Sequence, residues 1–488
     1  MILLDRNQNQ LQPAARYGLE VLLDLSRLLI AEQADSDLVR LKVVERESAG
    51  SAAADLSSKA ALEIGDGEVR VTTAALRGVA EVAGGALEQR SRAKDRHGRV
   101  PAAENPLVAA GQSRRPVVSL LGVELRRAVL AAAGRRPVRL LAPWPEGHRW
   151  AALLTHDLDV VEWWGLFPLL RMVELSMRGD WDRLRRVARA ARRSVGRDPV
   201  TRGVHSILQL EAHHLIRASW FVICQDPSLR SMLSGDSTYR PDSPAASRIL
   251  SALTHAGHEI GLHGSFATIN DPKRMTGQCR TLSRLASAPV TGVRQHFLRM
   301  RPGLTQRVMV DAGFEYDASW GFADRNGFRL GVADVVPAWD AAAETPLPLD
   351  LVPLTWMDRA LSKYAGVEEP GRWIEDAREL ARECKAVEGA WVGLWHPNTS
   401  EAFGFPGAEP AFVSLLQSLA DDRPFFGSAH RIVQWRRFRR SVRAARVTAD
   451  GRVILRTTAG QRTVIAIEDE SGDTTRVPVQ SKGSSGAA

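Results

Sequence analysis

The chain contains few cysteines and no long apolar run. Only Cys224, Cys279 and Cys384 occur among its 488 residues, and no two of them form a Cys-x-x-Cys pair. This excludes a disulfide-stabilised fold and a zinc finger built from cysteines. The first residues lack the apolar stretch of a secretory signal peptide, and no other apolar run approaches the roughly 20 residues of a membrane span. We therefore expect a cytoplasmic protein without a transmembrane segment.

The composition is that of a folded protein with an excess of arginine. Apolar residues make up 44% of the chain and charged residues 25%, and the formal net charge is +9. Nine arginines and three acids lie between Arg178 and Arg202, and seven arginines and no acid lie between Arg431 and Arg446. Such clusters can attract nucleic acid, anionic lipid or a phosphorylated substrate.

A solvated helix face is the simpler interpretation of these clusters. In the first cluster one helical stripe is apolar and leaves the arginines on the outer face, with the members Trp181, Leu184, Ala188, Ala191 and Val195. We therefore expect no nucleic-acid partner, and we keep a peripheral membrane contact through the arginines as an open alternative.

The chain divides into a region without recognisable catalytic motifs and a longer region in which predicted strands and helices alternate. Residues 1–148 predict an α+β region of unknown role. From 149 to 440, short apolar strands alternate with helices, which predicts parallel strands joined by helices, as in a barrel. Residues 441–480 predict a small β module whose Asp450-Gly451 pair signals a hairpin, and residues 481–488 a disordered tail. The strands expected in the long region are 150–155, 217–224, 258–263, 289–296, 313–319 and 390–396.

Polar residues follow four of these predicted strands at the point where each strand ends. They are Asp157 with Asp159, His263, Arg294 with His296, and His396. In barrels of parallel strands, active sites form at this end because the loops converge there. Each group can also be explained without an active site: acidic loops are common, an arginine can pair with any acid, and a lone histidine is often structural. Four such coincidences along one chain favour a site.

Spacing separates the residues of two of these segments. In THDLD (155–159) the carboxylates of Asp157 and Asp159 are two residues apart, so they point to one side of an extended strand. Paired carboxylates allow one to bind a metal while the other moves protons. In GHEIGLHGS (257–265), His258 and His263 are roughly 16 Å apart on a strand, so they cannot bind one ion. His263 is the candidate, and we expect His258 to be structural.

Together these segments resemble the polysaccharide deacetylase family, also called carbohydrate esterase family four, over about residues 149–440. The resemblance implies a distorted (β/α) barrel of this type and removal of an acetyl group, N-acetyl more often than O-acetyl, from a sugar or glycan precursor. It implies a divalent metal, Zn²⁺ being the expected ion. The implied roles are Asp157 as base, Asp159 and His263 as metal ligands, Arg294 as the group that orients the base, His396 as acid, and Asp317 and Trp320 as residues that shape the pocket.

One departure from the family's pattern concerns the metal. The second motif normally carries another histidine four residues after the first, where this chain has Ala267. A catalytic zinc generally has three protein ligands, so Asp159 and His263 alone would hold it poorly. His296 can supply the third. The alternatives are a ligand elsewhere, or a catalytically inactive relative that binds a glycan or an assembly partner. A different metal hydrolase on a similar barrel is a further rival, although a glycosidase would need two opposed carboxylates.

Overall fold

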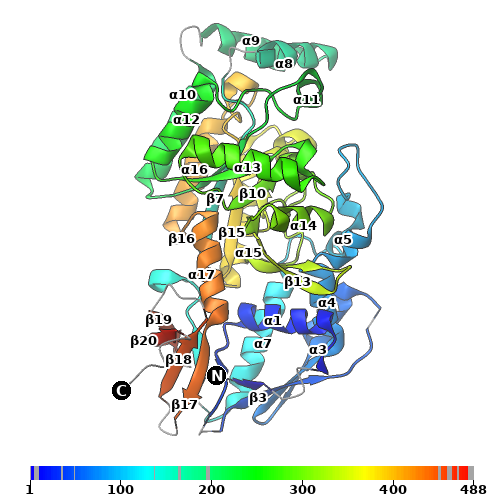
Figure 1. The fold of residues 1–488 in the computed structure, drawn as a ribbon, viewed down its shortest axis with the longest axis vertical. Helices are drawn as coiled ribbons and strands as arrows, with labels where there is room; N and C mark the ends of the chain where they lie inside the picture. Colours follow the sequence, from blue (N-terminus) through cyan, green and yellow to red (C-terminus); the bar gives the residue numbers. More distant parts are fainter. Residues whose placement is uncertain are drawn as a thin grey trace.

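Two ten-stranded sheets organise the computed structural model, one above the other in Figure 1. The structure describes residues 2–4, 10–34, 37–48, 50–136, 138–162, 166–193, 198–448, 452–458, 464–469 and 472–481. The predicted hairpin pair Asp450-Gly451 and residues 482–488 of the predicted tail lie outside these ranges. All statements below concern the described residues.

The upper sheet contains the strands expected of a barrel. Its order is β12-β13-β11-β10-β9-β8-β7-β15-β14, with β12 antiparallel at one edge and the other neighbours parallel. Among the described residues no pairing joins β12 to β14, so the sheet is an open, distorted half-barrel. The strands are β7 Ala151–Leu158, β8 Ser219–Ile223, β9 Glu259–Gly264, β10 Gly292–Gln295, β11 Tyr316–Asp317, β12 Val336–Asp340, β13 Thr345–Leu351, β14 Trp356–Met357, β15 Ala390–Leu394 and β16 Phe425–Phe426, which pairs with the start of β7.

Helices cover this sheet, with α10, α12 and α16 along one side and α13 and α14 in front in Figure 1. They are α8 Leu166–Met177, α9 Trp181–Arg193, α10 Pro199–His213, α11 Leu229–Ser234, α12 Pro244–His255, α13 Pro272–Ala286, α14 Leu304–Asp311, α15 Pro370–Ala386, α16 Ala408–Asp421 and α17 Ala429–Ser441. The predicted α/β fold class and all six predicted strands are confirmed, with ends that differ by a few residues.

Local sequence explains both the strands and the helix starts. Every residue of β7, β8 and β15 is buried, as expected for parallel strands covered on both faces. Helices α10, α12 and α13 each begin with a capping side chain followed by proline; the caps are Asp198, Ser243 and Asp271. The cap oxygen accepts a hydrogen bond from the first turn, and proline presets the helical φ angle.

The lower sheet is built from both ends of the chain. Its order is β4-β5-β3-β1-β2-β17-β18-β20-β19-β6, so the C-terminal strands are inserted between two N-terminal ones. Its strands are β1 Ile2–Leu4, β2 Ile30–Ala31, β3 Val39–Val44, β4 Leu62–Gly65, β5 Glu68–Thr72, β6 Leu140–Leu141, β17 Arg443–Val447, β18 Val453–Thr457, β19 Val464–Glu468 and β20 Thr474–Ser481. The helices of this half are α1 Pro13–Ser26, α2 Ala52–Asp55, α3 Ser58–Ala61, α4 Thr73–Val82, α5 Ala86–Arg90, α6 Pro106–Ala109 and α7 Val117–Ala133. The domain boundaries at 148 and 441 remain predictions.

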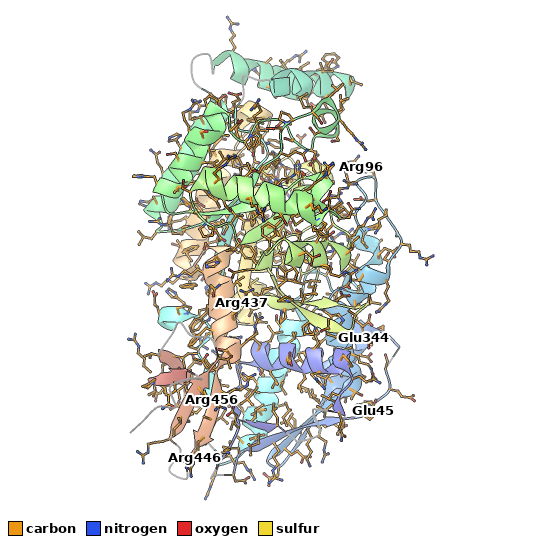
Figure 2. All side chains as sticks on the ribbon, viewed as in Figure 1. Glu45, Arg96, Glu344, Arg437, Arg446 and Arg456 are labelled. Atoms are coloured by element: carbon orange, nitrogen blue, oxygen red, sulfur yellow. The ribbon has the colours of Figure 1, made fainter. Side chains whose placement is uncertain are left out.

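The second arginine cluster holds the two halves together. Most of it lies on α17, with Arg443 and Arg446 on β17, and Figure 2 shows Arg437 between the upper and lower sheets. Arg437 binds Glu315 at 2.8 Å, and the buried Arg439 pairs with Asp24 of α1. The buried Arg436 pairs with Asp334. These arginines therefore form internal ion pairs rather than the solvated face expected from the sequence.

The first arginine cluster packs differently from the predicted stripe. Val187 is fully buried and Leu184 half-buried, but Trp181 and Ala188 are exposed. The side chain of Ala191 and the whole of Val195 lie outside the described residues. Arg185, Arg189 and Arg192 are exposed, as expected of an outer helix face. None of the described helices combines the length and the apolar character needed to cross a membrane.

Candidate active site

The predicted site residues converge at the carboxyl ends of neighbouring strands. Asp157 is the penultimate residue of β7, and Asp159 comes directly after this strand. His263 lies near the end of β9, and His296 and His396 follow β10 and β15. Parallel pairing brings His263 opposite Arg294 of β10. The aspartates and histidines of this group line a cavity of about 360 Å³, a size that suits a small ligand, whereas Arg294 lies behind its wall.

Three side chains form a candidate metal centre. Asp159 Oδ1 lies 3.4 Å from His263 Nε2 and 3.5 Å from His296 Nε2. One ligand atom from each residue lies within 4.8 Å of the others. Asp159 Oδ1 is buried and has no hydrogen-bond partner among the described residues. One carboxylate and two imidazoles, with an orphaned oxygen between them, fit a divalent transition metal.

The two histidines are oriented by groups behind them. His263 Nδ1 lies 2.9 Å from the carbonyl oxygen of Arg294, to which it can donate a hydrogen bond, so Nε2 is left to bind a metal. His296 Nδ1 lies 3.5 Å from Asp236 Oδ1 and makes no hydrogen bond among the described residues, so Asp236 acts on this ring through its charge. Asp236 is itself fixed, because it accepts a hydrogen bond from the Phe266 amide at 2.8 Å. A carboxylate behind a metal-bound histidine holds the ring in position.

The turn after β10 holds His296 beside the segment that contains Ala267. Ala267 lies in a short 3₁₀ helix, and its neighbour Phe266 packs against the His296 ring. Phe297 and Leu298 follow His296 with positive φ angles of 60° and 53°. Non-glycine residues adopt this conformation only when the surroundings enforce it, and such strain is concentrated at functional sites.

The N-terminal region provides part of that enforcement. Arg99 donates a hydrogen bond to the Phe297 carbonyl at 3.0 Å, and the His97 ring stacks on the Phe297 ring. Arg99 also lines the cavity. No motif or spacing in the sequence points to this role of Arg99.

Asp157 is held by a buried arginine. Arg294 Nη1 donates to Asp157 Oδ1 at 2.8 Å and to Thr155 Oγ1 at 2.9 Å, and its Nε donates to the Ala318 carbonyl at 3.0 Å. The other oxygen, Asp157 Oδ2, lies 3.5 Å from His263 Nε2 and therefore faces the metal centre. The expected contact between Arg294 and Asp157 is present.

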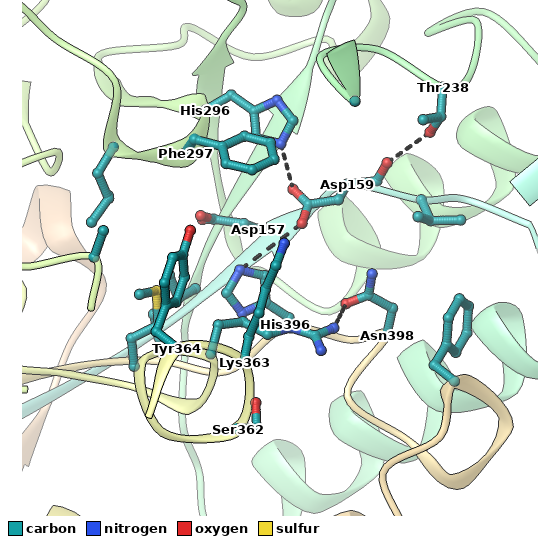
Figure 3. Close-up of a pocket in the computed structure, with 18 of the residues that line it drawn as sticks. Asp157, Asp159, Thr238, His296, Phe297, Ser362, Lys363, Tyr364, His396 and Asn398 are labelled. Carbon is teal, nitrogen blue, oxygen red and sulfur yellow. Dashed lines mark hydrogen bonds and ion pairs between the residues drawn. The ribbon is translucent and has the colours of Figure 1, made fainter. Parts of the chain in front are cut away.

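His396 is the third histidine whose ring faces Asp159. Its Nε2 lies 3.9 Å from Asp159 Oδ2, and its Nδ1 lies 2.6 Å from Asp358 Oδ1 (Figure 3 shows the side chains around Asp159). Asp358 is fully buried and also accepts hydrogen bonds from the His396 amide and from Thr399. The sequence analysis missed Asp358, although it follows strand β14 directly, which is the same signal that identified the other site residues.

Burial and charge shift the protonation of the site. Burial would raise the pKa of the Asp159 carboxyl, but His263, His296 and His396 lower it below its usual range. Burial would lower the pKa of His263, but Asp157 and Asp159 raise it above its usual value. Burial would also raise the pKa of Asp358, which the charge of His396 lowers. The carboxylates thus create a negative potential that a divalent cation would neutralise.

Two of the residues named by the resemblance support the site without lining it. Asp317 is fully buried, accepts a hydrogen bond from Gln306 at 2.8 Å, and has a pKa raised by burial. Trp320 is buried with its ring against Gly85. Neither is among the residues that line the cavity. His258 accepts a hydrogen bond from the Ala218 amide outside the site, in agreement with a structural role.

Comparisons with known proteins give similarities of fold at low identity. No protein-family model matches the chain, and no curated protein matches it by sequence. A protein of Mycobacterium smegmatis assigned to the polysaccharide deacetylases is 20% identical, with a TM-score of 0.39, over 60% of this chain and 92% of that one. PuuE allantoinase is 16% identical, with a TM-score of 0.39, over 60% and 92% of the two chains. A Pseudomonas aeruginosa protein assigned to the polysaccharide deacetylases is 17% identical, with a TM-score of 0.39, over 60% and 93%.

Proposed function

We propose that the chain is a metal-dependent hydrolase that removes an acetyl group, preferentially N-acetyl, from a sugar of a glycan precursor. The observation that carries the proposal is the arrangement of three differently supported groups around one pocket. These are the Asp159/His263/His296 ligand set, a carboxylate clamped by Arg294, and a histidine held by a buried carboxylate. Each group suits a different task in amide hydrolysis.

When bound, a divalent metal, with Zn²⁺ the expected ion, would polarise the acetyl carbonyl and lower the pKa of the attacking water. Asp159, His263 and His296 would hold it. Asp157 accepts from Arg294 through Oδ1, so Oδ2 remains available to take the proton of the water. Arg294 keeps this carboxylate in place during the transfer.

His396 would deliver a proton to the departing amine. Its Nδ1 is held by Asp358, so the proton to be donated resides on Nε2, which faces the pocket. The buried Asp358 carboxylate stabilises the imidazolium that the acid must form. The base and the acid approach different members of the ligand set: Asp157 Oδ2 lies 3.5 Å from His263 Nε2, and His396 Nε2 lies 3.9 Å from Asp159 Oδ2.

A catalytically inactive relative is the second candidate, and the alanine at position 267 is the observation that favours it. A glycosidase is less well supported, because Asp157 and Asp159 both approach His263 Nε2, at 3.5 and 3.4 Å, instead of opposing each other across the pocket.

Acetate release from a panel of N-acetylated and O-acetylated sugars, nucleotide sugars and lipid-linked sugars tests the proposal. We expect release that a chelator abolishes and that added Zn²⁺ restores. Metal binding without acetate release from any substrate would favour the inactive relative, and full activity after chelation would contradict the mechanism.

A further inference from the structure

Exposed apolar side chains are concentrated on three helices beside the pocket. Five of the eleven exposed large apolar side chains among the described residues lie on α8, α9 and α11. They are Val173 (49% exposed), Met177 (83%), Trp181 (55%), Leu229 (71%) and Leu233 (77%). Val173 and Met177 are four residues apart and therefore share one face of α8. Exposed apolar side chains that cluster in this way indicate a binding surface.

These helices border the mouth of the pocket. Glu174 of α8, Arg178 directly after that helix, and Met232 of α11 line the same cavity as the metal centre. In Figure 1, α8 and α9 are the uppermost elements, with α11 directly below them. The apolar side chains therefore lie on the end of the molecule from which a substrate enters. We call the five apolar residues, together with the exposed Arg178, Arg185, Arg189 and Arg192, the rim surface.

Exposed arginines surround the apolar residues of the rim surface. Arg178, Arg185, Arg189 and Arg192 are exposed. Helix α9 contains six arginines and a single acid, Asp182. The pairs Arg178–Glu174 at 2.8 Å and Arg185–Asp182 at 3.4 Å lie within exposed helices, where ion pairs are weak, so the surface keeps a positive potential.

We propose that the rim surface docks on an anionic lipid bilayer, with Met177, Trp181 and Leu233 entering the headgroup region and the arginines contacting lipid phosphates. Helices that bind at the membrane interface combine these two features: apolar and aromatic side chains on one face, and an excess of Lys or Arg beside them. A soluble glycan would need neither. The charge complementarity points to a lipid surface rather than to a second copy of this chain, whose own rim would repel it.

The inference deepens the proposed function and rests on it in one respect. A pocket whose mouth lies on the bilayer receives a sugar that is attached to a lipid, so the substrate class is an acetylated sugar linked to a membrane lipid. Docking itself does not depend on catalysis, because none of the three anchoring side chains lines the cavity.

Co-sedimentation of the full-length protein with vesicles tests docking. We expect binding to vesicles of phosphatidylcholine mixed with phosphatidylglycerol, weaker binding to phosphatidylcholine alone, and loss of binding at high salt. Met177→Asp/Trp181→Asp should weaken the partition at least about tenfold, because two apolar anchors become charged. Leu233→Asp on α11 is an independent variant with the same expected direction. Ile64→Asp is the matched control, since Ile64 is an exposed apolar residue on β4 of the lower sheet and should bind like wild type.

The outcomes separate the inference from the proposed function. Asp159→Asn should lose activity and keep vesicle binding, so failure of catalysis leaves docking measurable. The anchor variants should keep acetate release from a soluble acetylated sugar and lose it from a vesicle-borne substrate. Anchor variants that bind vesicles as wild type does would overturn the inference. So would a wild-type dimer, seen by sedimentation velocity, that the anchor variants dissociate, because the surface would then belong to a second copy.

Discussion

Replacement of Asp358 by asparagine should disable the proposed acid while the metal ligands stay in place. Both oxygens of Asp358 act as acceptors: Oδ1 for His396 Nδ1 at 2.6 Å, and Oδ2 for the His396 amide at 3.1 Å and for Thr399. An amide has only one acceptor oxygen. If its NH₂ replaces Oδ2, it faces two donors. If it replaces Oδ1, its N–H donates to His396 Nδ1, which keeps that nitrogen unprotonated and prevents the imidazolium from forming.

The expected loss follows from that geometry. Asparagine removes the charge that stabilises the His396 imidazolium, so kcat should fall by most of the roughly 10²–10⁴-fold that general acid catalysis supplies. One buried group left without a partner should lower stability by about 1–3 kcal/mol. The assay is acetate release, with metal content and thermal unfolding measured on the same preparation.

A matched variant separates catalysis from burial. Asp340 is also buried and accepts hydrogen bonds, from Arg307 and from two backbone amides, but it does not line the pocket. Asp340→Asn should cost stability and leave kcat near wild type. A kcat for Asp358→Asn within about threefold of wild type would refute the reasoning, since general acid catalysis is worth far more.

Further predictions concern the two aspartates at the end of β7, Asp157 within the strand and Asp159 directly after it, the support of His296, and the contact between the two halves. Asp159→Asn should lose metal and activity together, whereas Asp157→Asn should keep metal and lose roughly 10²–10⁴-fold in rate; the reverse pattern in metal analysis would exchange their roles. Asp236→Ala should weaken metal affinity about 10–100-fold by freeing the His296 ring, measured by competition with a chromogenic chelator. Asp24→Asn should lower the free energy of unfolding by about 3–5 kcal/mol, because the buried Arg439 of α17 loses its carboxylate partner. Burial would raise the pKa of Asp24, but the arginines of α17 lower it below the ordinary 3.8; its contribution is therefore complete above that pH and lost as the pH falls through the lowered pKa, which denaturant titrations at several pH values would measure.

The sequence predicted the upper half well because its signals are local. Buried apolar strands, capped helix starts and polar residues directly after strands can each be recognised within about ten positions of the chain. His263 and Arg294 are the penultimate residues of β9 and β10, and the structure brings them together with Asp157. Asp358 comes directly after a strand, but that strand, β14, is only two residues long and its apolar signal is too short to recognise.

Other features depend on residues far apart in the chain and could not be predicted. The arginines of α17 look like a solvated face until their partners, such as Asp24 at the other end of the chain, are known. Strands β17 to β20 look like a separate module because their neighbours β2 and β6 lie at the opposite end of the sequence. The support that Arg99 gives to the turn after His296 is of the same kind.

The metal content of four purified proteins tests the central claim most directly. Wild type, His263→Ala, His296→Ala and His258→Ala would be saturated with Zn²⁺, dialysed and analysed by inductively coupled plasma mass spectrometry. The account predicts close to one equivalent in wild type and His258→Ala, and comparable loss in His263→Ala and His296→Ala, because both histidines ligate the ion with Asp159. Full occupancy in His296→Ala, or no bound metal in wild type, would contradict it.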